Sequence, residues 1–122
     1  MKSLGKRGED LAATFLENLG YRILQRNYRT RRGEVDIVAL DRFTLVFVEV
    51  KSRRSSTYGR ALEAVDEHKQ RQIYQTAEAF LHEHQGEGYY DLNVRFDVVE
   101  VYGTEPPEIY HHRGCFDGNG LF

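Results

Sequence analysis

Two short segments, Gly33–Val38 and Phe47–Lys51, constrain what this chain can fold into more than any other feature. Each places acidic residues inside a strand-like run of valine, isoleucine, leucine and phenylalanine. The stretch Asp41–Thr44 between them is typical of a tight turn, so the two segments predict an antiparallel hairpin with a two-residue loop. Asp41 then lies opposite Thr44, and this pairing fixes the register of the whole hairpin.

The predicted register brings carboxylates together. Counted back from the turn, Asp36 faces Glu49, and Glu34 faces Lys51. Facing residues of an antiparallel pair have Cβ atoms roughly 4.5–5.5 Å apart, and like charges at that separation repel. Asp36 and Glu49 therefore need a cation between them. A hard divalent metal ion is the natural one, because it prefers carboxylate oxygens.

The two faces of the hairpin differ in polarity. One face is apolar throughout, whereas the other is apolar near the turn and charged at its far end. A hairpin at the protein surface normally alternates apolar and polar residues cleanly. We therefore expect a central hairpin, covered on both faces, with a charged pocket opening at one end.

The rest of the pattern predicts one α/β domain over residues 1–122, in the order αβββαββ, with a mixed sheet and helices packed on it. Apolar residues at helical spacing predict helices over residues 3–19 and about 66–84. Strands are expected over residues 21–28, 34–41, 44–52, 94–102 and 108–112. The glycine-rich tail, residues 113–122, is expected to be irregular.

Several features favour a cytoplasmic protein. Cys115 is the only cysteine, so an internal disulfide is impossible, which suits a reducing compartment. The basic residues near the N-terminus are not followed by the apolar run of a signal peptide. No stretch approaches the roughly 20 apolar residues of a membrane span, so we expect no membrane partner.

The net charge of −2 hides a strong asymmetry along the chain. Residues 1–71 carry 15 Lys and Arg against 10 Asp and Glu, whereas residues 72–122 carry 2 against 9. Basic residues flank the predicted carboxylates on both sides, and such patches supply the sequence-independent part of nucleic-acid binding. For any single arginine the alternative is an ordinary solvated position. The candidates for contacting a phosphate backbone are Arg29, Arg31, Arg32, Arg53 and Arg54.

Metal-assisted hydrolysis of a phosphodiester is the chemistry that fits these residues. Asp36 and Glu49 would hold Mg²⁺ or Mn²⁺ with help from the Val50 backbone carbonyl, and the metal would acidify a bound water. Lys51 would orient the attacking water or neutralise charge in the transition state. Glu34 would either join the outer shell of the metal or form a cross-strand ion pair with Lys51.

Two charged residues on the predicted helices add to this site. Glu9 lies two turns before Leu16 on the apolar stripe of the first helix, and Lys69 is in register with Ile73 on the inward stripe of the second. Both can point at the carboxylates. The alternatives are a first-turn glutamate that favours the helix dipole and a lysine that extends past the edge of the core.

Four further residues carry weaker signals. Asp97 is either structural or at the rim of the pocket. His111 and His112 are adjacent, so on a strand they face opposite ways and cannot easily share a metal ion. Cys115 has no evident histidine partner for catalysis.

Gly33–Asp36 followed by Val48–Lys51 resembles the D…(D/E)-x-K signature of the restriction-endonuclease-like superfamily. More closely, the chain resembles the YraN-type family of uncharacterised bacterial proteins over nearly all of residues 4–101. The features that carry this resemblance outside the hairpin are Gly5–Glu9, Gly20–Tyr21, Arg26–Arg29, Glu63–Val65, Lys69 and Arg95–Val98.

The resemblance implies a restriction-endonuclease-like core, αβββαβ, with a mixed central sheet flanked by helices, similar to archaeal Holliday-junction resolvases. In those resolvases a glutamate of the first helix joins the metal-site group, which would be Glu9 here. The implied activity is that of a divalent-metal-dependent endonuclease on DNA, with branched or damaged DNA as candidate substrates. A resolvase-like role would favour a symmetric homodimer.

Two other functions compete with the nuclease. One is a non-catalytic nucleic-acid-binding module that retains the nuclease fold. The other is a small interaction protein whose acidic C-terminal half docks a basic partner. Metal dependence separates the nuclease from both, and salt-dependent DNA binding separates the binding module from the interaction protein.

Overall fold

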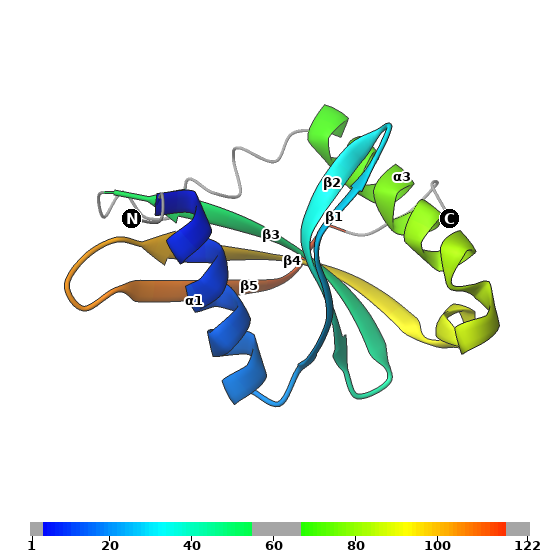
Figure 1. Ribbon diagram of the computed structural model, residues 1–122, viewed down its shortest axis with the longest axis horizontal. Coiled ribbons are helices and arrows are strands. Elements are labelled where there is room, and N and C mark those ends of the chain that lie inside the picture. Colours follow the sequence, from blue (N-terminus) through cyan, green and yellow to red (C-terminus); the bar gives the residue numbers. More distant parts are fainter. Residues whose placement is uncertain (1–3, 55–66, 117–122) are drawn as a thin grey trace.

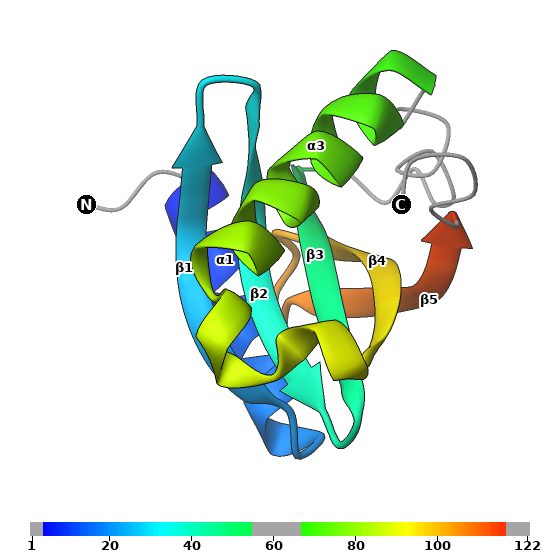
Figure 2. The same cartoon turned by 90° about the vertical axis from the view of Figure 1, so that its right-hand side faces the viewer.

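A five-stranded mixed sheet lies between two helices in the computed structural model, which describes residues 4–54 and 67–116 (Figure 1). The helices are α1 (Leu4–Asn18) on one face and α3 (Glu67–Glu83) on the other (Figure 2). The strands are β1 (Arg22–Thr30), β2 (Gly33–Asp41), β3 (Thr44–Arg53), β4 (Asn93–Tyr102) and β5 (Glu108–Phe116). Short 3₁₀ turns, η1 (Gln85–Glu87) and η2 (Tyr89–Asp91), lead from α3 into β4. None of the described helices is long and apolar enough to cross a membrane.

The spatial order of the strands follows the chain, β1-β2-β3-β4-β5. Neighbouring strands are antiparallel except β3 and β4, which are parallel. A parallel pair needs a crossover connection, and α3 lies in it. The α/β class, the mixed sheet and the central place of the β2–β3 hairpin are therefore confirmed.

The end of the chain differs from the expectation. β5 continues to Phe116, so an irregular tail is wrong for residues 113–116. Asp97 explains the extension, because its Oδ1 accepts a hydrogen bond of 3.0 Å from the Gly114 N–H group and so holds this part of β5 against β4. Residues 117–122 lie outside the described part, as do the first residue expected for the second helix and the motif at 63–65.

The predicted hairpin register is confirmed near the turn and lost farther away. The ladder runs from Asp41↔Thr44 back to Ile37↔Val48. Beyond this point the described residues of β2 pair with β1, and the β1–β2 hairpin diverges from β3 (Figure 1). The predicted Glu34–Lys51 pair is wrong for this reason, since Glu34 pairs with Arg29 instead.

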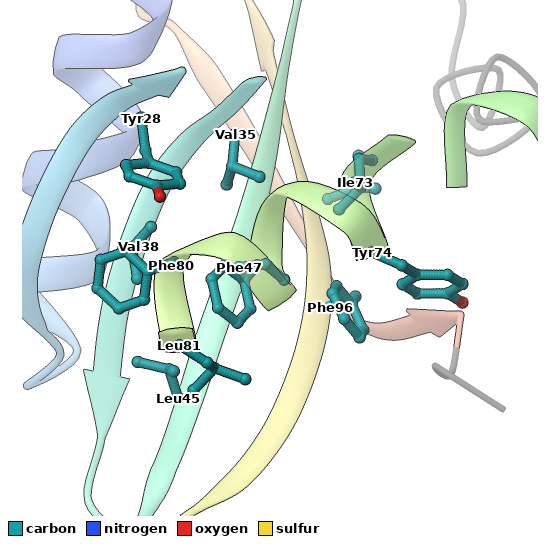
Figure 3. Packing of buried hydrophobic residues seen from close by; sticks show 12 residues of the cluster. Tyr28, Val35, Val38, Leu45, Phe47, Ile73, Tyr74, Phe80, Leu81 and Phe96 are labelled. Atoms are coloured by element: carbon teal, nitrogen blue, oxygen red, sulfur yellow. The ribbon is translucent and has the colours of Figure 1, made fainter. Parts of the chain in front are cut away.

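Alternate residues of β3 supply two cores, one on each face of the sheet. On the α3 face, Phe47 stacks on Phe96 at a centroid distance of 5.7 Å and meets the edge of Phe80 at 5.9 Å (Figure 3). On the α1 face, Val46 and Val48 are fully buried in the second cluster. A strand that is apolar on both faces belongs in the middle of a sheet, as the sequence pattern predicts.

A buried charge network on the α1 face ties β5 to β4. Asp97 is fully buried and accepts hydrogen bonds from the Arg95 guanidinium at 2.9 and 3.0 Å, and its Oδ2 lies 2.7 Å from His111 Nε2. Burial raises the pKa of Asp97, but the hydrogen bonds from His111, Arg95 and the Gly114 N–H group outweigh it and lower the pKa below its usual value. Asp97 is therefore structural and does not line the carboxylate pocket.

We expect Asp97→Ala to lower the free energy of unfolding by about 3–5 kcal/mol, because it leaves Arg95 without its buried counter-charge. Urea unfolding followed by circular dichroism measures this change. Asp91→Ala, at an exposed position just before β4, is the matched control and should change the stability little. Equal stability of the two variants would contradict the structural role.

Candidate active site

The candidate site lies where the β2–β3 ladder ends and α3 begins. β3 presents Glu49 and Lys51 on the α3 face, beyond the apolar side chain of Phe47. The first turn of α3 brings Lys69 to the same place, and β2 contributes Asp36. Four of the residues that the sequence singled out thus come together from three elements of the fold.

Glu49 is the centre of this group and is only 8% exposed. Its Oε1 lies 3.6 Å from Lys51 Nζ and 3.5 Å from Lys69 Nζ. Its Oε2 is buried and has no hydrogen-bond partner among the described residues. A buried carboxylate oxygen without a partner is costly, so this atom is the natural position for a bound cation.

Asp36 of β2 contacts the backbone of β3 at Val50, the residue after Glu49. Its Oδ2 accepts a hydrogen bond of 2.7 Å from the Val50 N–H group. Burial and then the negative charge of Glu49 raise the pKa of Asp36 to about 7, against the lowering effect of that hydrogen bond. Val50 therefore contacts the site through its N–H group, and the role of its carbonyl as a metal ligand stays a prediction.

Glu9 of α1 is buried, and its carboxylate already accepts hydrogen bonds from side chains of β1. Its Oε1 accepts hydrogen bonds from Arg26 Nε at 3.0 Å and from Asn27 Nδ2 at 2.9 Å. Asn27 has a φ of 55°, in the left-handed region that asparagine tolerates better than most residues. The negative charge of Glu9 is one of the smaller causes that raise the pKa of Asp36. A metal-binding role for Glu9 stays a prediction.

The tip of the β1–β2 hairpin forms a basic groove with α3 next to this site. The groove has a volume of about 580 Å³ and is lined by Arg29–Glu34 of the hairpin and by Lys69, Gln72 and Ile73 of the helix. A second groove of about 660 Å³ shares Arg29–Arg32 and runs along α3 to Tyr90. Three of the arginines predicted to contact phosphates, Arg29, Arg31 and Arg32, thus line the same groove as Lys69, which itself contacts Glu49.

Gly33 allows the hairpin and the helix to come this close. A Cβ atom there would lie 3.2 Å from Thr76 Oγ1 and 3.3 Å from Gln72 Cβ.

Arg53 and Arg54 follow Lys51 in the chain, at the end of β3. Arg53 Nε is buried without a hydrogen-bond partner among the described residues, whereas Arg54 is exposed. The structure does not bring these two arginines into the groove of the β1–β2 hairpin.

Sequence reasoning missed Glu100, a buried carboxylate on the same face of the sheet. It is 1% exposed, and its side chain is held by Tyr102 and His112. Glu100 is the register partner of Lys51 in the parallel β3–β4 pair. The signal was a single glutamate in the otherwise apolar run Val98–Tyr102, which is unusual in a buried strand.

The residues present fit a divalent cation. Glu49 Oε2 is a buried acceptor without a hydrogen-bond partner among the described residues, and burial and the charge of Glu49 raise the pKa of the second carboxylate, Asp36. Asp36 and Glu49 would hold the ion. In the described part of the chain, no three carboxylate, imidazole or thiol groups already converge at metal-binding distance.

The raised pKa of Asp36 predicts a pH-dependent cost in the metal-free protein. The folded state retains a proton that the unfolded state releases, so stability falls as the pH rises from about 4 to about 7. In EDTA at pH 8, Asp36→Asn should therefore be more stable than the wild type by on the order of 1–3 kcal/mol. At pH 3.5 (roughly the ordinary Asp value) the difference should vanish. Urea unfolding at both pH values measures it.

The exposed substitution Asp91→Asn is the control for this measurement and should show no such pH dependence. Added Mg²⁺ or Mn²⁺ should stabilise the wild type at pH 8 more than Asp36→Asn, because binding to the folded state alone shifts the unfolding equilibrium. A wild type more stable than Asp36→Asn in EDTA at pH 8 would contradict the assigned environment of Asp36.

Comparison with known proteins identifies relatives along most of the chain. The model of the uncharacterised protein family UPF0102 matches residues 8–101. A UPF0102 protein of Geobacter sulfurreducens is 52% identical over 118 residues, which cover 95% of this chain and 90% of the relative. One from Chlorobium phaeobacteroides is 51% identical over 98 residues, covering 80% and 75%. One from Persephonella marina is 43% identical over 113 residues, covering 93% and 92%.

Proposed function

We propose that this chain, which belongs to the uncharacterised protein family UPF0102, is a divalent-metal-dependent nuclease that hydrolyses phosphodiester bonds in DNA. One observation carries the proposal. The buried carboxylate of Glu49 has one oxygen beside two lysines and the other without a hydrogen-bond partner in the described part of the chain, and a second carboxylate of raised pKa, Asp36, lies beside it.

The element order supports a restriction-endonuclease-like core. Helix α1, strands β1–β3, helix α3 and strand β4 follow one another as αβββαβ. The D…(D/E)-x-K residues lie at the end of the central hairpin, and Asp36 reaches the backbone next to Glu49. Asp36, Glu49 and Lys51 thus lie within one small region of the molecule, which supports matching them to the signature of that superfamily.

Each side chain would have a distinct task. A divalent ion held by Asp36 and Glu49 would polarise the phosphoryl group and supply a water of lowered pKa. Lys51 is within 3.6 Å of Glu49, so its ammonium group can hold the attacking water and offset negative charge as it develops. Lys69 would contact the phosphate from the helix side. The arginines of the β1–β2 turn would bind neighbouring phosphates of the DNA backbone.

A non-catalytic nucleic-acid-binding module is the second candidate. The observation that favours it is the pairing of Glu9 with Arg26 and Asn27, which uses one oxygen of a carboxylate that a catalytic site would otherwise offer to metal. The basic groove beside α3 suits both functions. Hydrolysis is the property that separates them.

Cleavage of labelled duplex, single-stranded, flap and four-way-junction DNA in Mg²⁺ or Mn²⁺ tests the nuclease. We expect metal-dependent cutting that Asp36→Ala and Lys51→Ala each reduce on the order of 10²–10³-fold, because each removes charge stabilisation at the reacting phosphate. Arg42→Ala, in the exposed β2–β3 turn at the opposite end of the hairpin, is the control. Salt-sensitive binding without cutting in all proteins would favour the binding module.

The basic groove makes a separate prediction about affinity. Arg31→Ala and Arg32→Ala should each weaken DNA binding, and each should reduce the slope of log K against log salt by about 0.7–0.9, the value of one phosphate contact. Fluorescence anisotropy over a salt series measures both quantities. The same substitution at Arg42 should leave the slope unchanged. Equal slopes for all three variants would exclude the groove as the path of the DNA.

A further inference from the structure

Glu100, Tyr102 and His112 form a polar cluster that the proposed chemistry does not use, here called the Glu100 cluster. The Tyr102 hydroxyl donates to Glu100 Oε2 at 2.7 Å, and His112 Nε2 lies 2.6 Å from Glu100 Oε1. Glu100 is almost completely buried, whereas the His112 side chain is 29% exposed. A buried carboxylate therefore fixes an imidazole that solvent, or a ligand, can reach.

The sheet register places the Glu100 cluster beside the candidate active site. Glu49 is the register partner of Val98 in β4, and Val98 is the partner of His112 in β5. Phe96 and Val98 pack on the α3 face, so Glu100 and His112 share that face with Glu49. Two strand spacings separate the backbones of Glu49 and His112, or about 10 Å.

The neighbouring histidine, His111, lies on the opposite face of the sheet and has different surroundings. His111 packs edge-on against the rings of Phe15 and Tyr21, on the α1 face, and is paired with Asp97. Its side chain is 7% exposed. The two histidines thus have the same kind of carboxylate partner but opposite surroundings, one closed in the core and the other open on the face of the site.

The chemistry of the cluster suits an anionic ligand. When Nε2 donates to Glu100, the orientation of the ring is fixed, and Nδ1 is the nitrogen that can face a ligand. With Nε2 donating to Glu100, a phosphate oxygen that accepts from Nδ1 would hold the ring with both nitrogens protonated, and this hydrogen bond would be charge-assisted. Anchoring β5 alone would not need a buried charge, since an apolar pair of similar volume usually stabilises as well.

We infer that His112, oriented by Glu100, binds a phosphate of the nucleic-acid strand next to the phosphate at Glu49. The inference rests on the proposed function, because it extends the same site toward β5. It assigns a substrate contact to a residue outside the matched family segment, residues 8–101. The strand would cross the sheet from the basic groove at α3, over Lys51, to the edge formed by β5.

Binding of a short single-stranded DNA and its duplex, measured by fluorescence anisotropy with Ca²⁺ in place of Mg²⁺, tests this contact without requiring cleavage. His112→Gln keeps an N–H donor for Glu100 but removes the imidazole ring whose Nδ1 would face the phosphate, and it should weaken binding about tenfold. The slope of log K against log salt should fall by about 0.7–0.9. Replacing phosphates one at a time by neutral methylphosphonates should reveal one position that costs the wild type affinity and costs His112→Gln nothing.

Glu100→Gln gives a second, independent variant. It should weaken binding at the same phosphate, and the double variant with His112→Gln should bind no worse than either single one, since the two residues act as one unit. His111→Gln is the matched control, with thermal unfolding to show that each variant is folded. It should bind DNA as the wild type does.

Three outcomes would overturn the inference. They are wild-type affinity in a folded His112→Gln protein, an equal loss in His111→Gln, or the absence of a methylphosphonate position that distinguishes His112→Gln from the wild type. If the wild type binds DNA and cuts it but His112→Gln binds equally well, this inference fails and the proposed function stands. If the wild type binds no nucleic acid at low salt, the proposed function fails with it.

Discussion

The hydrogen bond from the Val50 N–H group to Asp36 is the contact on which the candidate site depends. It lies just beyond Ile37↔Val48, where the regular β2–β3 ladder ends and β2 turns away with β1. Without divergence, Asp36 would be an ordinary ladder residue, and no space would open beside β3. Because the strands diverge, the Asp36 carboxylate takes the place of a backbone carbonyl as the acceptor for the Val50 N–H group and lies beside a second carboxylate, Glu49.

This arrangement places two carboxylates, Asp36 and Glu49, side by side where β2 and β3 diverge. Lys51 and Lys69 both contact Oε1 of Glu49, whereas Oε2 has no hydrogen-bond partner among the described residues. Burial and the charge of Glu49 raise the pKa of Asp36 beside it. A structural ion-pair network would satisfy each oxygen, as the network around Asp97 does. The contrast between the two carboxylate groups in one sheet is the reason to propose ligand binding for the first and a stabilising role for the second.

Local chemistry predicted much of this molecule, and long-range pairing accounts for what it missed. The turn at Asp41–Thr44 and the apolar alternation of β3 fixed the hairpin register near the turn, because both signals are local. The loss of register before Ile37 depends on how β1 twists β2 away, which no residue of the hairpin encodes by itself. The partner of Glu9 likewise comes from β1, seventeen residues farther along the chain. Glu100 went unnoticed because one of its two partners, His112, becomes a neighbour only when β5 joins the sheet.

Strands β4 and β5 carry the same chemical pair twice, once on each face. Asp97 with His111 faces α1, where Arg95, Tyr21 and Phe15 enclose it. Glu100 with His112 faces the side of Glu49 and Lys51, where the imidazole is partly exposed. Alternation along adjacent strands makes this division unavoidable, since residues one apart point to opposite faces. The β4–β5 pair thus stabilises the edge of the sheet on the α1 face and presents polar side chains on the face of Glu49 and Lys51.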